Sequence, residues 1–191
     1  MDVAQLAVAA ALAWGAGLRA YAVIFLVGLV GTLGWLELPE HLRVLQHPLV
    51  LGASGLMTAV EFFADKLPWL DSLWDAVHSF IRIPAGAALA AGVLGDAGTP
   101  VALAAAILGG SLAAGVHLAK AGARAAINTS PEPVSNWTAS LAEDAAVPAG
   151  LWLAVAHPIA FFVFLFLFLV GAVLLLRFIW HGLRRVFGRT A

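Results

Sequence analysis

Long apolar runs separated by short polar turns dominate this 191-residue chain. A helix that crosses a bilayer needs about 20 consecutive, mostly apolar residues. Runs of this kind occupy residues 3–35, 48–66, 84–95, 101–127, 137–156 and 158–180. The pattern predicts an all-α integral membrane protein with about six transmembrane helices, built as a single polytopic domain over residues 1–191.

The first apolar run is too long for one straight crossing, and Gly15, Gly17 and Arg19 interrupt it. It is either one tilted helix or a short segment followed by a span that starts at Tyr21. Arg19 is then either a functional residue inside the membrane or a side chain that reaches the interface.

Residues 69–83 have a different pattern, with polar and apolar positions alternating at helical spacing between Pro68 and Pro84. Proline ends helices, so this segment is expected to be a separate amphipathic helix on the cytoplasmic side. The run at 84–95 is short for a crossing unless the preceding helix supplies part of it.

Ionisable residues fall in register on two of the predicted helices. One acid-rich stripe has i, i+4, i+7, i+11 spacing and comprises Asp71, Asp75, His78 and Arg82. A basic stripe has i, i+3, i+7, i+11 spacing and comprises His117, Lys120, Arg124 and Asn128. Each set lies on one face of a helix, and charges in a membrane must be paired or hydrated. The two stripes therefore predict a shared polar site.

Further polar residues are expected to join this site from neighbouring segments. The predicted binding residues for a solute or ion are Glu61, Asp65, Asp71, Asp75, His78, Arg82, His117, Lys120, Arg124, Asn128, Glu132 and Glu143. Residues 128–133 form a proline-rich loop that is either a lid over the site or a rigid turn. Glu143 and Asp144 are adjacent, so only one of them is expected to face the site.

Each of the two stripes has two chemical interpretations. Asp71, Asp75 and His78 offer ligands for a divalent cation, the one cofactor that the sequence suggests. The alternative is that the acids pair with Lys66, Arg82, Lys120 and Arg124. The basic stripe offers donors for a phosphate or lipid headgroup, or it is the other half of the same pairing.

Composition narrows the function classes. The chain has 10 Lys and Arg against 11 Asp and Glu, which gives no basic surface for nucleic acid. It has no cysteine, which excludes disulfides, thiolate metal sites and thiol catalysis. None of the common hydrolase, nucleotide or zinc-protease motifs is present, so an enzyme is less expected than a protein without catalytic activity.

Orientation follows from the distribution of basic residues. The tail at 181–191 is basic and is expected in the cytoplasm. Counting back through six spans places both termini and the polar site on the cytoplasmic side. The expected location is the bacterial inner membrane.

Five short strings resemble a known family. They are Gly17-Leu-Arg-Ala-Tyr21, Glu61-Phe-Phe-Ala-Asp-Lys66, Asp71-Ser-Leu-Trp-Asp75, His117-Leu-Ala-Lys-Ala-Gly-Ala-Arg124 and Asn128-Thr-Ser-Pro-Glu-Pro133. These strings resemble the bacterial membrane family called domain of unknown function 4126, over roughly residues 17–157. The resemblance implies a small multi-span protein and no particular substrate.

The leading functional hypothesis is a transporter or channel-like protein for a small solute or ion. The first alternative is an intramembrane enzyme or carrier that acts on a lipid phosphate, and the second is a structural or assembly subunit. Six spans are few for a solute carrier, so a homo-oligomer is expected, with the Ala- and Gly-rich run at 101–127 as a packing surface within or between protomers.

Overall fold

The computed structural model describes residues 1–67, 70–128 and 133–187, and these residues are helical almost throughout. The elements in chain order are α1 (Val3–Thr32), η1 (Glu40–Gln46), α2 (Pro48–Ala64), α3 (Leu70–Leu94), η2 (Gly95–Ala97), α4 (Thr99–Ile127), α5 (Pro133–Ala156) and α6 (Pro158–Phe187). Five helices are long and apolar enough to cross a membrane, or six if the bent pair η1 and α2 counts as one span. The predicted all-α membrane fold is confirmed.

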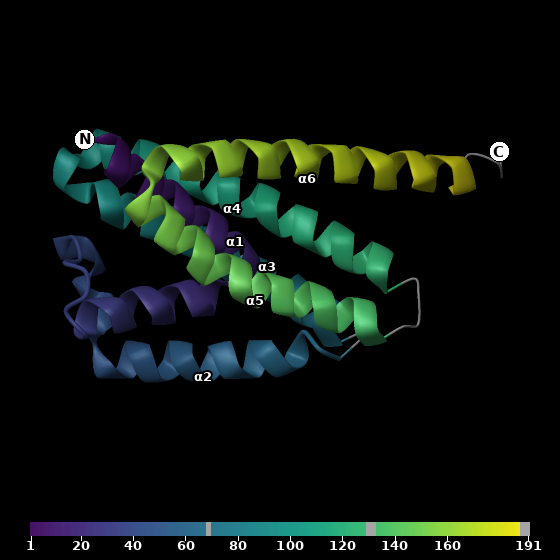
Figure 1. The fold of residues 1–191 in the computed structure, drawn as a ribbon, viewed down its shortest axis with the longest axis horizontal. Coiled ribbons are helices and arrows are strands. Elements are labelled where there is room, and N and C mark those ends of the chain that lie inside the picture. The colour runs from purple at the N-terminus through teal and green to yellow at the C-terminus, as the bar shows by residue number, and fades with distance from the viewer. Residues whose placement is uncertain (68–69, 129–132, 188–191) are drawn as a thin grey trace.

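The first helix folds back on itself. Arg19 has extended backbone angles, φ −149° and ψ 82°, and interrupts α1. A Cβ added to Gly15 would lie 2.8 Å from Val23 Cγ2, although residues eight apart in a straight helix are about 12 Å apart. Val8 and Val30 also line one cavity. α1 is therefore a helical hairpin, with arms at residues 3–18 and 20–32 and its tip at Arg19 (Figure 1).

Neither arm of this hairpin is long enough to cross a bilayer alone. The second arm has 13 residues, which corresponds to about 20 Å, against a hydrocarbon thickness of about 30 Å. The break at Arg19 agrees with the expectation of a short segment followed by a second one from Tyr21. The second segment, however, turns back and does not continue across the molecule.

The remaining helices run back and forth along the long axis, and the start of α1 and the end of α6 lie at opposite ends of it (Figure 1). The sequence predicted both termini at one membrane face, because it counted the first apolar run as a crossing. The hairpin is followed by five α-helices, α2 to α6, and the membrane side of each terminus stays a prediction.

α3 also differs from its expected form. The amphipathic segment and the short apolar run form one continuous 25-residue helix with Pro84 inside it. Small residues make this possible, because Gly86 packs directly against Ala113 and the backbone at Gly109 of α4. The acid-rich stripe is thus the first half of a helix long enough to span the membrane.

The apolar part of the core lies around the arms of the hairpin. Trp14 is fully buried and contacts Phe161, Phe164 and Phe168 of α6 edge-on, with ring centroids 5.2–6.4 Å apart. A cavity of about 310 Å³ lies between the two arms, η1, α3 and α5. The tip of the hairpin, in contrast, points into charged side chains.

Candidate functional site

Ten ion-paired side chains gather around the tip of the hairpin and form what we call the charge network. Within the described residues they are the bases Arg19, Lys66, Arg82, Lys120 and Arg124 and the acids Glu61, Asp65, Asp75, Glu143 and Asp144. Five positive and five negative formal charges cancel. The network joins α1, α2, α3, α4 and α5 at one place in the bundle.

Arg19 is the hairpin's contribution and is 1% exposed. Its guanidinium lies 2.9 Å from Asp65 Oδ2 and 3.1 Å from Asp144 Oδ1. It also donates to the hydroxyl of Ser140 at 3.1 Å. The extended backbone at Arg19 lets one residue stand at the end of both arms, so its side chain reaches α2 and α5 together.

Lys120 binds both the hairpin and the acids. Its Nζ donates to the carbonyl oxygen of Leu18 at 3.2 Å, a group left without a helical partner where the first arm ends. The same Nζ lies 3.2 Å from Asp65, 3.4 Å from Asp75 and 3.2 Å from Glu143. A cation at the C-terminal end of a helix also interacts favourably with the helix dipole.

Arg82 bridges α2 and α3, with Glu61 and Asp75 each 2.5 Å away. It also lies 3.0 Å from Nδ1 of His117. Because arginine only donates, this nitrogen must accept, and His117 is neutral with its proton on Nε2. Nε2 lies 2.6 Å from the hydroxyl of Ser79, to which it donates. The imidazole thus connects α4 to α3 as a neutral group.

Arg124 holds α5 in place through two partners. It lies 3.1 Å from Glu143, and it donates to both the side-chain and the backbone oxygen of Asn136. Asn136 is 1% exposed and Ser140 is fully buried. Sequence reasoning did not select these two residues, although 136, 140 and 143 follow i, i+4, i+7 spacing and share a helix face.

The three residues of the expected metal site each have other partners in the structure. Asp75 is held by Arg82 and Lys120, whereas Asp71 accepts two hydrogen bonds of 3.1 Å from Asn128. His78 stacks on Trp74 with ring centroids 3.9 Å apart. No group of three His, Asp or Glu residues among those the structure describes has the geometry to bind a metal ion.

The alternative interpretation of the stripes, mutual pairing, agrees with the geometry. Glu61, Asp65, Asp75 and Glu143 pair with the predicted bases, and Asp144, the neighbour of Glu143, pairs as well. Adjacent residues both reach the network because Arg19 contacts each of them. Glu132 and the rest of the predicted lid at 129–132 lie outside the described residues.

Lys66 lies at the edge of the network, in the connection after α2. Its Nζ is 3.0 Å from the centre of the Phe62 ring and 3.7 Å from Asp144 Oδ2. Burial lowers the pKa of Lys66 below its ordinary value, and the carboxylate of Asp144 offsets part of this effect.

Several buried carboxylate oxygens have spare capacity to accept a hydrogen bond. Glu61 Oε2, Asp65 Oδ1 and Asp75 Oδ2 lie out of reach of solvent and have no hydrogen-bond donor among the described residues. An unsatisfied buried oxygen carries a desolvation cost. Such oxygens can accept a further hydrogen bond or contact a small cation.

The comparisons with known proteins give a family but no function. Searches of curated proteins and of solved structures found no match. The sequence matches the model of a family described as a domain of unknown function (DUF4126) over residues 6–178. This match covers most of the chain, including the hairpin and every residue of the charge network, and the protein therefore belongs to the DUF4126 family.

Proposed function

We propose that the protein is a membrane transporter for a small solute or ion, in which the charge network is the coupling element and the hairpin tip is a moving part. The observation that carries this proposal is the position of Arg19. A hairpin that ends inside the bundle, on buried ion pairs contributed by α2 and α5, is a costly arrangement in a membrane.

Broken helices at membrane depth support this assignment. Non-helical backbone in a membrane domain is tolerated only where protein or a polar cavity surrounds it. Transporters use discontinuous helices of this kind at their binding sites, because helix ends supply free backbone groups there. In this chain the backbone is extended at Arg19, and the carbonyl of Leu18 accepts a hydrogen bond from Lys120.

The spare carboxylate oxygens indicate how coupling would work. Binding of a small cation beside Asp75 or Glu61 would weaken their hold on Arg82. Arg82 would then be free to change partners, which gives the network a second arrangement. This mechanism needs no enclosed metal and uses only groups already in contact.

A structural or assembly subunit is the second candidate. The equal number of positive and negative charges in the network supports it, since a fully paired network needs no ligand. It predicts that the double substitution Asp75→Lys and Lys120→Asp restores the stability that each single substitution removes. The lipid-phosphate enzyme has less support, because Lys120 and Arg124 are already held by acids.

For membrane orientation, we propose that the C-terminal end of α6 faces the cytoplasm of a bacterial cell and that the N-terminal end faces outward. Basic residues gather toward the end of the molecule where α4 and α6 finish, which the positive-inside rule assigns to the cytoplasm. Because the chain contains no cysteine, Asp2→Cys and Arg184→Cys can be labelled singly with an impermeant thiol reagent. We expect labelling from opposite sides of the membrane.

The first test of transport is solvent access to the network. Ser140→Cys replaces a fully buried hydroxyl with a thiol of similar size beside Arg19. If the hairpin tip moves, an impermeant thiol reagent will modify this cysteine from at least one side. Ser54→Cys is the matched control, since Ser54 is 5% exposed and bonds only to its own helix backbone. A network that never opens would leave both cysteines unmodified and favour the structural subunit.

The second test is flux in liposomes that contain the purified protein. Protons, sodium, potassium and phosphate serve as probes, each with its own internal dye or isotope. Asp75→Asn should abolish any flux of the wild type, because it removes a carboxylate that binds both Arg82 and Lys120. Asp71→Asn is the same change one turn away on the same helix and should retain flux.

A further inference from the structure

The last part of α6 carries a charged side chain that faces away from the bundle. Arg177 is exposed and sits in the most apolar helix of the chain. Within the described residues no acidic side chain lies within ion-pair distance of it. An arginine at the edge of the hydrocarbon region is costly unless an anion or water meets it.

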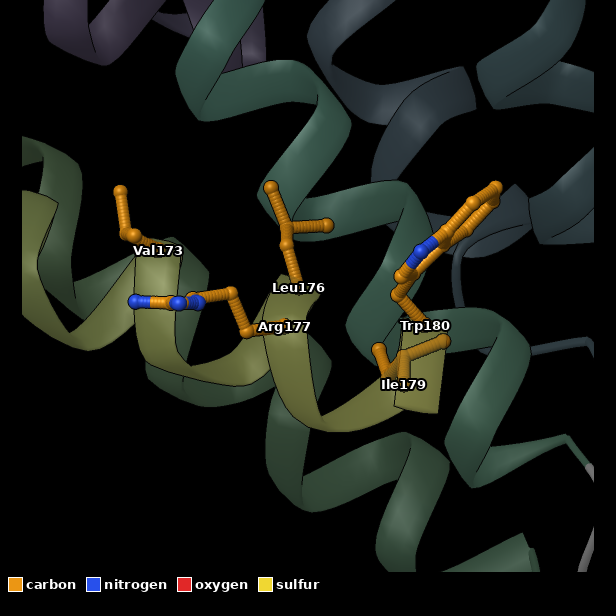
Figure 2. Close-up of a pocket in the computed structure, with 5 residues that line it drawn as sticks. All are labelled: Val173, Leu176, Arg177, Ile179 and Trp180. Atoms are coloured by element: carbon orange, nitrogen blue, oxygen red, sulfur yellow. The ribbon is translucent and has the colours of Figure 1, made fainter. Parts of the chain in front are cut away.

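Arg177 lines an open groove of about 440 Å³ whose other described walls are Val173, Leu176, Ile179 and Trp180 (Figure 2). Two of its lining residues also pack on α4, since a Cβ at Gly122 would lie 3.2 Å from Leu176 and 3.4 Å from Ile179. The walls are apolar and aromatic, apart from the single guanidinium. This composition fits a ligand with a negative head and an apolar tail.

The depth of the groove matches the boundary between hydrocarbon and headgroups. A crossing of about 20 residues counted from Pro158 ends near Arg177. The side chain of Arg177 extends back along the helix toward Val173 (Figure 2). Trp180 lies one turn further on, with Arg184 stacked 5.1 Å from its ring, as is typical of interfacial residues.

We propose that this groove binds an anionic phospholipid, with its phosphate on Arg177 and an acyl chain along Val173 and Leu176. Guanidinium groups bind phosphates with two parallel hydrogen bonds, and basic grooves on the cytoplasmic side recognise anionic headgroups. The site is separate from the charge network, so it does not depend on the proposed transport activity.

Native mass spectrometry of the full-length protein in mild detergent tests this site. Phosphatidylglycerol, phosphatidylcholine and inorganic phosphate are added separately at equal concentration. The wild type should retain phosphatidylglycerol in preference to phosphatidylcholine, and Arg177→Gln should lower the retained phosphatidylglycerol about fivefold or more. Arg177→Lys keeps the positive charge but lacks the planar guanidinium group, so this variant should retain an intermediate amount of phosphatidylglycerol.

Arg184→Gln is the matched control, because it removes one positive charge two turns away on the same helix. It should leave phosphatidylglycerol retention unchanged. An equal loss in the Arg177→Gln and Arg184→Gln variants would overturn the proposal in favour of general attraction to a basic surface. Undiminished retention in Arg177→Gln would also overturn it. Retention of inorganic phosphate without retention of phosphatidylglycerol would overturn the proposal by identifying the ligand as free phosphate and not as a lipid.

Discussion

The arms and the tip of the α1 hairpin are stabilised in different ways. The arms pack through apolar contacts around Trp14 and leave a cavity of about 310 Å³ beside them. The tip has a fully buried arginine with three kinds of polar partner. Apolar contacts are non-directional and tolerate a void, whereas a buried polar network depends on every partner being in place.

This difference indicates where the molecule is adaptable and where it is not. Small changes of volume around the arms have space to be absorbed, because the cavity already separates the helices there. Changes at the tip remove a charge or move a backbone that several helices contact together. The substitutions below test the contrast in order of expected effect.

Arg19→Met is expected to have the largest effect. It removes the cation that lies 2.9 Å from Asp65 and 3.1 Å from Asp144. The expected loss of stability is about 3–5 kcal/mol. Thermal or denaturant unfolding in detergent measures it. Arg43→Gln, at an exposed position in η1, is the control and should change stability by less than about 0.5 kcal/mol. Equal stability of the two variants would contradict a central role for the tip.

Gly17→Ala should have the next largest effect. A Cβ at Gly17 would lie 2.6 Å from the backbone oxygen of Ala113 and 2.8 Å from Val116 Cβ. Neither atom belongs to a flexible side chain, so we expect a loss of about 1–3 kcal/mol. Gly115→Ala adds the same methyl group where nothing lies within 4 Å and should not destabilise the protein. If both variants unfold alike, close packing at the tip is not the cause.

Val30→Leu adds one methylene group at the arms instead of the tip. Val30 lines the apolar cavity, so the added group fills space, and we expect a gain of up to about 1 kcal/mol. Val173→Leu, at a position that is 55% exposed, should leave stability unchanged. A clear loss in Val30→Leu would mean that the arms are as tightly constrained as the tip.

The pH dependence at Lys66 should be the smallest effect. Because burial lowers its pKa in the folded protein, the unfolded chain binds more protons between that lowered pKa and about 10.5. Folding stability should therefore rise with pH in this window. The free energy of unfolding is measured for the wild type and for Lys66→Met from pH 8 to 10.5. It should rise more steeply with pH in the wild type than in the variant. Parallel curves would argue against a buried, charged Lys66.

Most of the fold follows from the sequence. The runs at 48–66, 101–127, 137–156 and 158–180 became α2, α4, α5 and α6 with small shifts of their ends. Apolar runs report length and polarity but not direction, and for this reason the reversal inside α1 was not predicted. The signal was present, because 30 residues exceed one crossing and Arg19 stands in the middle of them.

The site was predictable where charges repeat on one helix. The stripes selected Asp75, Arg82, Lys120 and Arg124, and all four are in the charge network. The metal hypothesis stays a prediction, since spacing along one helix does not show which partners approach from other helices, and Asp75 is paired with Arg82 and Lys120. Asn136 and Ser140 were missed because they are uncharged, although each bonds to a buried arginine.

The position of Arg19 in the chain has a consequence for biosynthesis. Its described partners, at residues 65, 140, 143 and 144, are all translated after it. An arginine inserted alone near the bilayer centre costs about 2.5–3.5 kcal/mol on insertion scales. The full set of partners of Arg19 therefore exists only once α5 has been made, so the tip of the hairpin reaches its final packing after the helices that follow it.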